Sequence, residues 1–316
     1  MGNSGGVETE NLVRVPQSIV YLDLNKWIDL ARAEAGKDQK YASILKFCED
    51  RVTEGQAVFP LSSEHFMEVA KIGDDSRRIR LAGLMARLSK GWLIAAPNTL
   101  LVAELRRAIA MKFNKSHAPQ AAVAFTRSVR TAFGVLENGM EARNDILFQL
   151  PGVLEELLST ARTTRDFVNR WQTFANRHED ARSRVCDEPP EIRKRAYCAR
   201  LTIGIQDRLQ SVMKEFDLEW KDLESLGPEG CVELLELVPF FDVEINLNLQ
   251  RNQHRDRKIP PNDEIDIGFL AMAIPYCNIV VTERFWADLV RRANFHLKYR
   301  TKILHDMDEL SLALGA

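Results

Sequence analysis

The stretch IVYLDLNKWIDLARAEAG, residues 19–36, decides how the chain begins to fold. Residues 18–24 are rich in β-branched and aromatic side chains, which predicts a buried strand. Apolar residues then recur at helical spacing from Trp27, and Gly36 ends that pattern, so a helix is expected over residues 25–34. Asp23 therefore lies where a strand leaves the core and a helix begins.

The same strand-to-helix alternation continues along the chain. Further strands are predicted at 56–63 (QAVFPLSS), 92–97 (WLIAAP), 278–282 (NIVVT) and 301–305 (TKILH), with amphipathic helices between them. Strands that alternate with helices favour a mostly parallel sheet covered on both faces. We therefore predict an α/β fold, a three-layer α/β/α arrangement.

A long helical stretch interrupts this pattern. From residue 114 to residue 236 the sequence is helical in character and carries few strand signals. We expect four segments: a flexible tail at 1–13, a first part of the α/β domain at 14–113, a helical insertion at 114–236, and the second part at 237–316.

Composition excludes several classes of protein. A net charge of −2 gives no global attraction to a polyanion, so such a partner would be bound by a local patch. The five cysteines are scattered and contain no C-x-x-C pair, which is typical of a reducing cytoplasm. The longest apolar run, residues 267–281, is too short to span a bilayer and contains a proline. We expect a cytoplasmic protein without a membrane partner; its oligomeric state and protein partners stay open.

Carboxylates follow the predicted strands or begin the helices beside them. They are Asp23, Glu64 and Glu68 at i, i+4 spacing, Asp263, Glu264 and Asp266, and Glu283 after Thr282. Ligands bind beyond the carboxyl ends of parallel strands, where these side chains are expected to meet. Repelling carboxylates are stabilised by a hard cation such as Mg²⁺ or Mn²⁺.

A structural interpretation competes with this one. An acidic residue at a helix N-terminus stabilises that helix by capping and through the helix dipole, so each carboxylate taken alone has an ordinary explanation. His65 faces away from the Glu64 and Glu68 side of a regular helix, which favours a structural role. Trp27 and Trp286 lie at helical spacing with other apolar residues and are expected in the core.

Three stretches together resemble the PIN-like nuclease family. They are VYLDLNKWIDL, PLSSEHFMEVAK and DIGFLAMAIPYCNIVVTERFW, and the similarity covers roughly residues 18–112 and 237–310. The resemblance implies that Asp23 ends the first strand, with Asn25 in support, and that Glu68 is the second acid. It implies that Asp266 is the third acid and that an acid near Thr282 is the fourth.

The fourth position departs from the family pattern. The family acid usually stands two residues after the threonine, whereas here Glu283 follows Thr282 directly and Arg284 takes the usual place. This offset leaves open how much Glu283 contributes, and Glu64 remains an alternative second acid.

The resemblance implies metal-dependent hydrolysis of phosphodiester bonds, most often in RNA. A basic loop ahead of Asp263 (LQRNQHRDRKIPPND, 249–263) is expected to attract the polyanion through Arg251, Arg255, Arg257 and Lys258. An exposed linker is the competing interpretation of this loop. Two other functions stay open: a catalytically inactive nucleic-acid-binding protein, and a metal-dependent phosphohydrolase acting on DNA or a small molecule.

Overall fold

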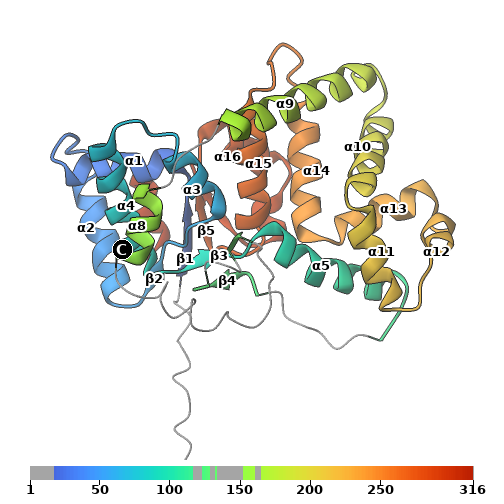
Figure 1. The fold of residues 1–316 in the computed structure, drawn as a ribbon, viewed down its shortest axis with the longest axis horizontal. Helices are drawn as coiled ribbons and strands as arrows, with labels where there is room; N and C mark the ends of the chain where they lie inside the picture. The colour runs from blue at the N-terminus through green and yellow to red at the C-terminus, as the bar shows by residue number, and fades with distance from the viewer. Residues whose placement is uncertain (1–17, 117–122, 129–131, 134–151, 161–164, 316) are drawn as a thin grey trace, which may run out of the picture.

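A computed structural model describes residues 18–116, 123–128, 132–133, 152–160 and 165–315 (Figure 1). The expected tail at 1–13 lies outside them. The strands are β1 Ser18–Leu22, β2 Ala57–Val58, β3 Leu93–Ile94, β4 Phe125–Thr126, β5 Ile279–Val281 and β6 Lys302–Leu304. The helices before the insertion are α1 Leu24–Glu34, α2 Ala42–Thr53, α3 Ser63–Val69, α4 Asp75–Ser89 and α5 Pro97–Lys112.

Helices dominate the remainder of the described chain. Those of the expected insertion are α8 Val153–Thr160, α9 Arg165–Val185, α10 Pro190–Gly204, α11 Gln206–Lys214, α12 Trp220–Ser225 and α13 Gly227–Glu236. After it come α14 Pro239–Arg251, α15 Pro261–Ala273, α16 Arg284–Arg292, α17 Phe295–Lys298, a 3₁₀ turn Met307–Glu309 and α18 Leu310–Ala313.

Four parallel strands form the central sheet in the order β2-β1-β5-β6. Strand β1 pairs with β5 from Val20 opposite Ile279 to Leu22 opposite Val281, so the two strands end together. Beyond β2, Leu61 forms a parallel bridge to Leu93 of β3, which itself pairs with β4 in antiparallel fashion. The first and last parts of the chain thus share one sheet, as the sequence pattern predicted.

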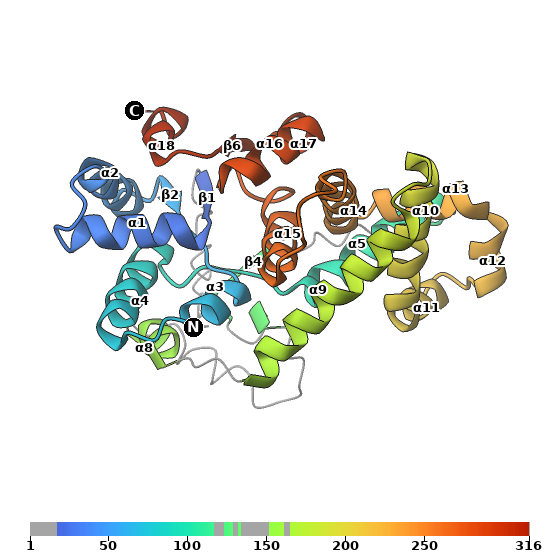
Figure 2. The ribbon, with the colours of Figure 1, turned by 90° about the horizontal axis from the view of Figure 1, so that it is seen from above.

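Side chains alternate between two hydrophobic cores along each central strand. Ile19 and Tyr21 of β1 belong to one core, whereas Val20 and Leu22 belong to the other. The helices α1, α2 and α4 pack in the second core, and α14, α15 and α16 pack in the first. Figure 2 shows these two groups on opposite sides of the sheet. Helices therefore cover both faces, which makes the α/β fold compatible with three layers.

The helices of the expected insertion do not form a core of their own. Helix α8 packs against α4, α9 packs against α15, and α11 and α13 pack against α5. Leu209 and Leu234, from α11 and α13, are buried in the same core as Tyr21 of β1. The long helical stretch therefore extends the packing on both faces of the sheet.

Strand lengths differ from the sequence prediction. The stretch 56–63 forms only two ladder residues before Pro60, which has no backbone N–H to donate, and pairing resumes at Leu61. Ser62 is the N-cap of α3. Among the described residues, no helix combines the length and apolar character that crossing a bilayer requires.

Candidate metal centre

Asp23 stands at the carboxyl end of β1 and is the N-cap residue of α1. Its backbone N–H donates to the carbonyl of Val281 over 3.0 Å, which joins the ends of β1 and β5. The Thr282 hydroxyl Oγ1 lies 3.4 Å from Asp23 Oδ2, to which it donates. Asp23 is buried, and the backbone N–H groups of Asn25 and Leu24, at the start of its own helix, lower the pKa of its carboxyl group less than burial and Glu283 raise it.

Helix α3 carries the second acidic pair. Glu68 is partly buried, and its carboxylate lies near enough to Asp23 for the negative charge of Asp23 to raise its pKa. Glu64, one turn earlier, is buried, and its Oε2 has no hydrogen-bond partner within the described part of the chain. Burial raises the pKa of Glu64. Glu64 in turn adds to the field that acts on Glu68.

His65 anchors this helix to β1. Its Nδ1 accepts a hydrogen bond from the Ser62 backbone N–H over 3.0 Å, and its Nε2 lies 2.8 Å from the carbonyl oxygen of Leu22. That carbonyl can only accept, so Nε2 carries the proton. Burial lowers the pKa of His65 to about 4, which keeps the ring neutral at physiological pH. His65 therefore has the expected structural role, next to Asp23.

Of the three acids at the start of α15, Asp266 is the one that lies near Asp23 and Glu68. Both carboxylates raise its pKa. Its Oδ2 accepts a hydrogen bond from Trp286 Nε1 over 3.0 Å. Trp286 is buried in the core, as expected. Its role as a donor to Asp266 was not predicted, because helical spacing alone cannot show which residue the indole N–H meets.

Asp263 and Glu264 instead pair with arginines. Arg257 contacts both oxygens of Asp263, one of them over 2.7 Å, and Arg251 Nη1 donates to Glu264 Oε1 over 2.7 Å. Glu264 also lies 3.1 Å from Nδ1 of the buried His178. These two carboxylates therefore stabilise the packing of α15, and the sequence pattern alone did not separate them from Asp266.

Glu283 follows β5 and is the N-cap residue of α16. It is exposed, and its Oε1 accepts a hydrogen bond from Asn25 Nδ2 over 2.6 Å. Its charge is the second-largest contribution to the raised pKa of Asp23, after burial. The offset from the family pattern thus leaves Glu283 within the electrostatic field of the other acids.

The carboxyl cluster is defined here as Asp23, Glu68, Asp266 and Glu283, and burial and repulsion by neighbouring carboxylates raise the pKa values of the first three. Burial is the largest cause in each of three cases, and the neighbouring carboxylates add to it. The pKa of Asp23 rises to about 6, that of Glu68 to about 7 and that of Asp266 to about 8. Near neutral pH the first three members therefore share protons, because the site does not stabilise all their negative charges at once.

The donor atoms of the cluster fit a hard divalent cation. They are all carboxylate oxygens, the ligand type that Mg²⁺ and Mn²⁺ prefer. A cation would also stabilise the charges that burial and repulsion now suppress. As the side chains stand, no three His, Cys, Asp or Glu residues in the described ranges converge closely enough to hold a metal ion. The donor atoms are thus of the type that such an ion prefers, but in this structure the side chains do not point to one common position.

The basic loop differs from the expectation at Arg251. This side chain is 1% exposed, and its guanidinium binds Glu264 and Asn248 Oδ1. The sequence interpretation of Arg251 as a phosphate contact is therefore wrong, because the residue ends α14 and faces the core. Hydrophilic composition alone does not reveal such a buried ion pair.

The other three basic residues occupy different environments. Arg255 is exposed and pairs with Asp187 over 2.9 Å, and Lys258 is exposed. The guanidinium of Arg257 is half-buried above the Phe285 ring, 4.5 Å from its centre. The hydrogen bond to Asp263 is the main cause that raises the pKa of Arg257, and the charges of Asp266 and Glu283 add to it, so the guanidinium lies within the field of the carboxyl cluster.

No family model, curated protein or solved structure matched the chain.

Proposed function

We propose that this protein is a metal-dependent endonuclease that hydrolyses phosphodiester bonds in RNA, on a PIN-like fold. One observation carries the proposal: Asp23, Glu68 and Asp266, from distant parts of the sequence, lie near the carboxyl ends of β1 and β5, close enough for Asp23 to raise the pKa of the other two. Raised pKa values in a group of acids are typical of functional sites, because packing alone gives no reason to gather like charges. The resemblance of the sequence to PIN-like nucleases supports the same function.

In this proposal Asp23, Glu68 and Asp266 hold Mg²⁺ or Mn²⁺, and Glu283 completes the site from its exposed edge. When bound, the metal would supply activation of water and stabilisation of the charge on the leaving oxygen. Glu64 remains the alternative to Glu68, because its buried carboxylate has an oxygen without a partner in the described residues.

Neighbouring polar groups orient the carboxylates. Trp286 Nε1 donates a hydrogen bond to Oδ2 of Asp266. In this proposal Oδ1 is the oxygen that would bind the ion. Thr282 contacts one oxygen of Asp23, and Asn25 contacts one oxygen of Glu283. Groups that hold a ligand through its second oxygen fix its direction, as partners of metal ligands usually do. Arg257, which pairs with Asp263, would attract a phosphate toward the cluster from its half-buried position.

The direct test is cleavage of an unstructured, end-labelled RNA in Mn²⁺ and in EDTA. We expect internal cuts in Mn²⁺ and none in EDTA. Tight binding without cleavage would replace the proposal by an inactive RNA-binding protein. Inertness toward RNA with hydrolysis of DNA or of a small phosphoester would replace it by a different phosphohydrolase.

A further inference from the structure

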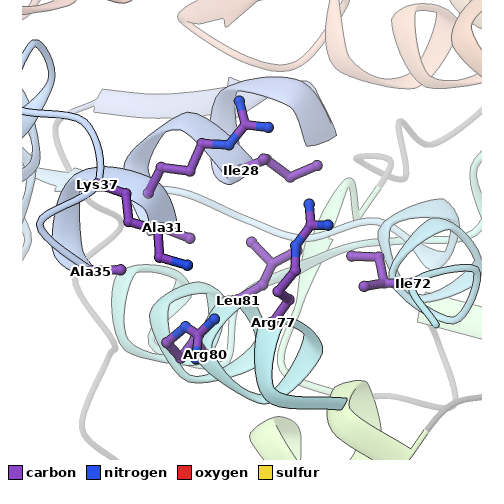
Figure 3. A pocket seen from close by; sticks show the side chains of 9 residues that line it. Ile28, Ala31, Ala35, Lys37, Ile72, Arg77, Arg80 and Leu81 are labelled. Atoms are coloured by element: carbon purple, nitrogen blue, oxygen red, sulfur yellow. The ribbon is translucent and has the colours of Figure 1, made fainter. Parts of the chain in front are cut away.

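A basic hollow lies between α1 and α4, apart from the carboxyl cluster. It measures about 270 Å³ and is shown in Figure 3. Helix α1 and the turn after it contribute one side, and helix α4 with the loop before it contributes the other. The lining residues are Ile28, Ala31, Arg32, Ala35, Lys37, Ile72, Arg77, Arg80 and Leu81.

All the charged residues that line this hollow are positive. Arg32 lies 3.6 Å from Asp29, a pairing of two solvent-accessible groups. Lys37, Arg77 and Arg80 form no ion pair with any residue that the structure describes, unlike Arg78, Arg106 and Arg182. Three unpaired cations around one depression repel each other, and a bound anion relieves that repulsion.

The floor of the hollow is apolar. Ile28 and Ala31 of α1 face Leu81 of α4 across it, and Ile72 closes one end. An apolar floor inside a basic rim suits a ligand with a flat, weakly polar part and an attached phosphate. A nucleotide of an unpaired strand has this combination, because its base can lie on apolar surface while its phosphate meets the cations.

The hollow is connected to the carboxyl cluster through two helices. Helix α1 begins directly after Asp23, and with a rise of about 1.5 Å per residue its Arg32 stands roughly 14 Å farther along the helix axis. Ile72 lies three residues beyond the end of α3, the helix that contributes Glu68. An RNA strand held at the carboxyl cluster would therefore reach the hollow by following α1.

We propose that this hollow, by its cations Lys37, Arg77 and Arg80, binds a nucleotide of single-stranded RNA that lies beyond the cleaved bond. The proposal rests on the proposed function and specifies its substrate: an unpaired strand long enough to cover both places. A duplex presents its bases stacked and paired, and offers none to the apolar floor.

The test is RNA binding by a triple variant, Lys37→Gln, Arg77→Gln and Arg80→Gln, measured with oligouridine in Ca²⁺ over a KCl series. The matched control changes Arg107, Arg208 and Lys214 to Gln, which removes the same charge from α5 and α11, far from α1 and α4 in Figure 1. Each neutralised phosphate contributes roughly 0.7 to the slope of log affinity against log salt, and one nucleotide adjoins at most two phosphates, so losing the three cations should flatten the plot by about 0.7 to 1.4. We expect this change only in the hollow variant.

Two further readings separate the hollow from the cluster. The dinucleotide UpU cannot span both places, so we expect its cleavage in Mn²⁺ to be equal in the wild type and the hollow variant. Cleavage of oligouridine at saturating enzyme should likewise keep its single-turnover rate. If the wild type cleaves RNA but both triple variants keep its salt slope, the hollow proposal is overturned and the proposed function stands. If the wild type neither binds nor cleaves RNA, the proposed function and the hollow proposal both fail.

Discussion

Asn25 donates a hydrogen bond from Nδ2 to Oε1 of Glu283 over 2.6 Å. Asn25 lies in the first turn of α1 and Glu283 directly precedes α16, so this bond joins helix starts from opposite ends of the sequence. The two helices follow adjacent strands, β1 and β5. The bond therefore restrains the most exposed member of the carboxyl cluster beside Asp23.

The first prediction concerns Asn25→Ala. Losing the donor frees the Glu283 side chain, and we expect RNA cleavage in Mn²⁺ to fall roughly 10- to 100-fold, the usual effect of losing a partner of a metal ligand. The measurement is the single-turnover rate, with Asn98→Ala on α5 as the control. Equal rates for the wild type and Asn25→Ala would show that the bond has no role in catalysis.

The second prediction is loss of cleavage in Asp23→Asn and in Asp266→Asn with the fold retained. Circular dichroism checks the fold, and single-turnover assays check the activity. Asp29→Asn on α1 and Asp288→Asn on α16 are controls at solvent-accessible positions. We expect both controls to cleave at the wild-type rate. Wild-type activity in either cluster variant would contradict the proposed site.

The third prediction compares the glutamates. Glu283→Gln should reduce cleavage less than Glu68→Gln, because Glu283 is exposed while Glu68 is partly buried in the field of Asp23. Glu64→Gln is the matched variant on the same helix. Similar losses for Glu283→Gln and Glu68→Gln would show that the sequence offset is unimportant. Full activity of Glu68→Gln with loss in Glu64→Gln would assign the second ligand to Glu64.

The fourth prediction is a pH dependence of stability in EDTA. The pKa of Glu68 is raised to about 7 and that of Asp266 to about 8, so the folded chain keeps protons that the unfolded chain has released. The free energy of unfolding therefore falls as pH rises from about 6.5 to 8.5. Below that range the lowered pKa values of His65 and His178 act in the opposite direction.

Thermal unfolding across this pH range provides the measurement. Asp266→Asn removes one of the raised groups, so its melting temperature should fall less with pH than that of the wild type. Mn²⁺ should raise the melting temperature most at the alkaline end, where the carboxylates are charged. Identical pH profiles for the wild type and Asp266→Asn would disprove the coupling.

The fifth prediction concerns Arg251. Arg251→Ala leaves the buried Glu264 without its main cationic partner, which should lower the free energy of unfolding by about 3–5 kcal/mol. Arg255→Ala, which removes an exposed pair with Asp187, should change it by less than about 1 kcal/mol. Urea titration of both variants distinguishes the two environments. A small effect for Arg251→Ala would show that the buried pair adds little net stability.

The sequence by itself determined the order of strands and helices in the α/β domain. Apolar runs that end at Asp23 and Thr282 can be recognised without coordinates, because period-two burial and helical spacing are local properties. The parallel sheet follows from that alternation, and the carboxyl ends of its strands mark where ligands bind. The acids of the candidate site were therefore predictable as a group.

Only the tertiary structure decided which charged groups meet. Asp263 and Asp266 stand three residues apart on one helix, yet the first pairs with Arg257 and the second lies with Asp23. Arg251 belongs to a basic stretch of sequence but ends a helix inside the core. Which charged groups pair depends on which side chains the fold brings within a few ångströms of one another. Burial then strengthens each of these charge interactions. Local patterns contain no information about that pairing.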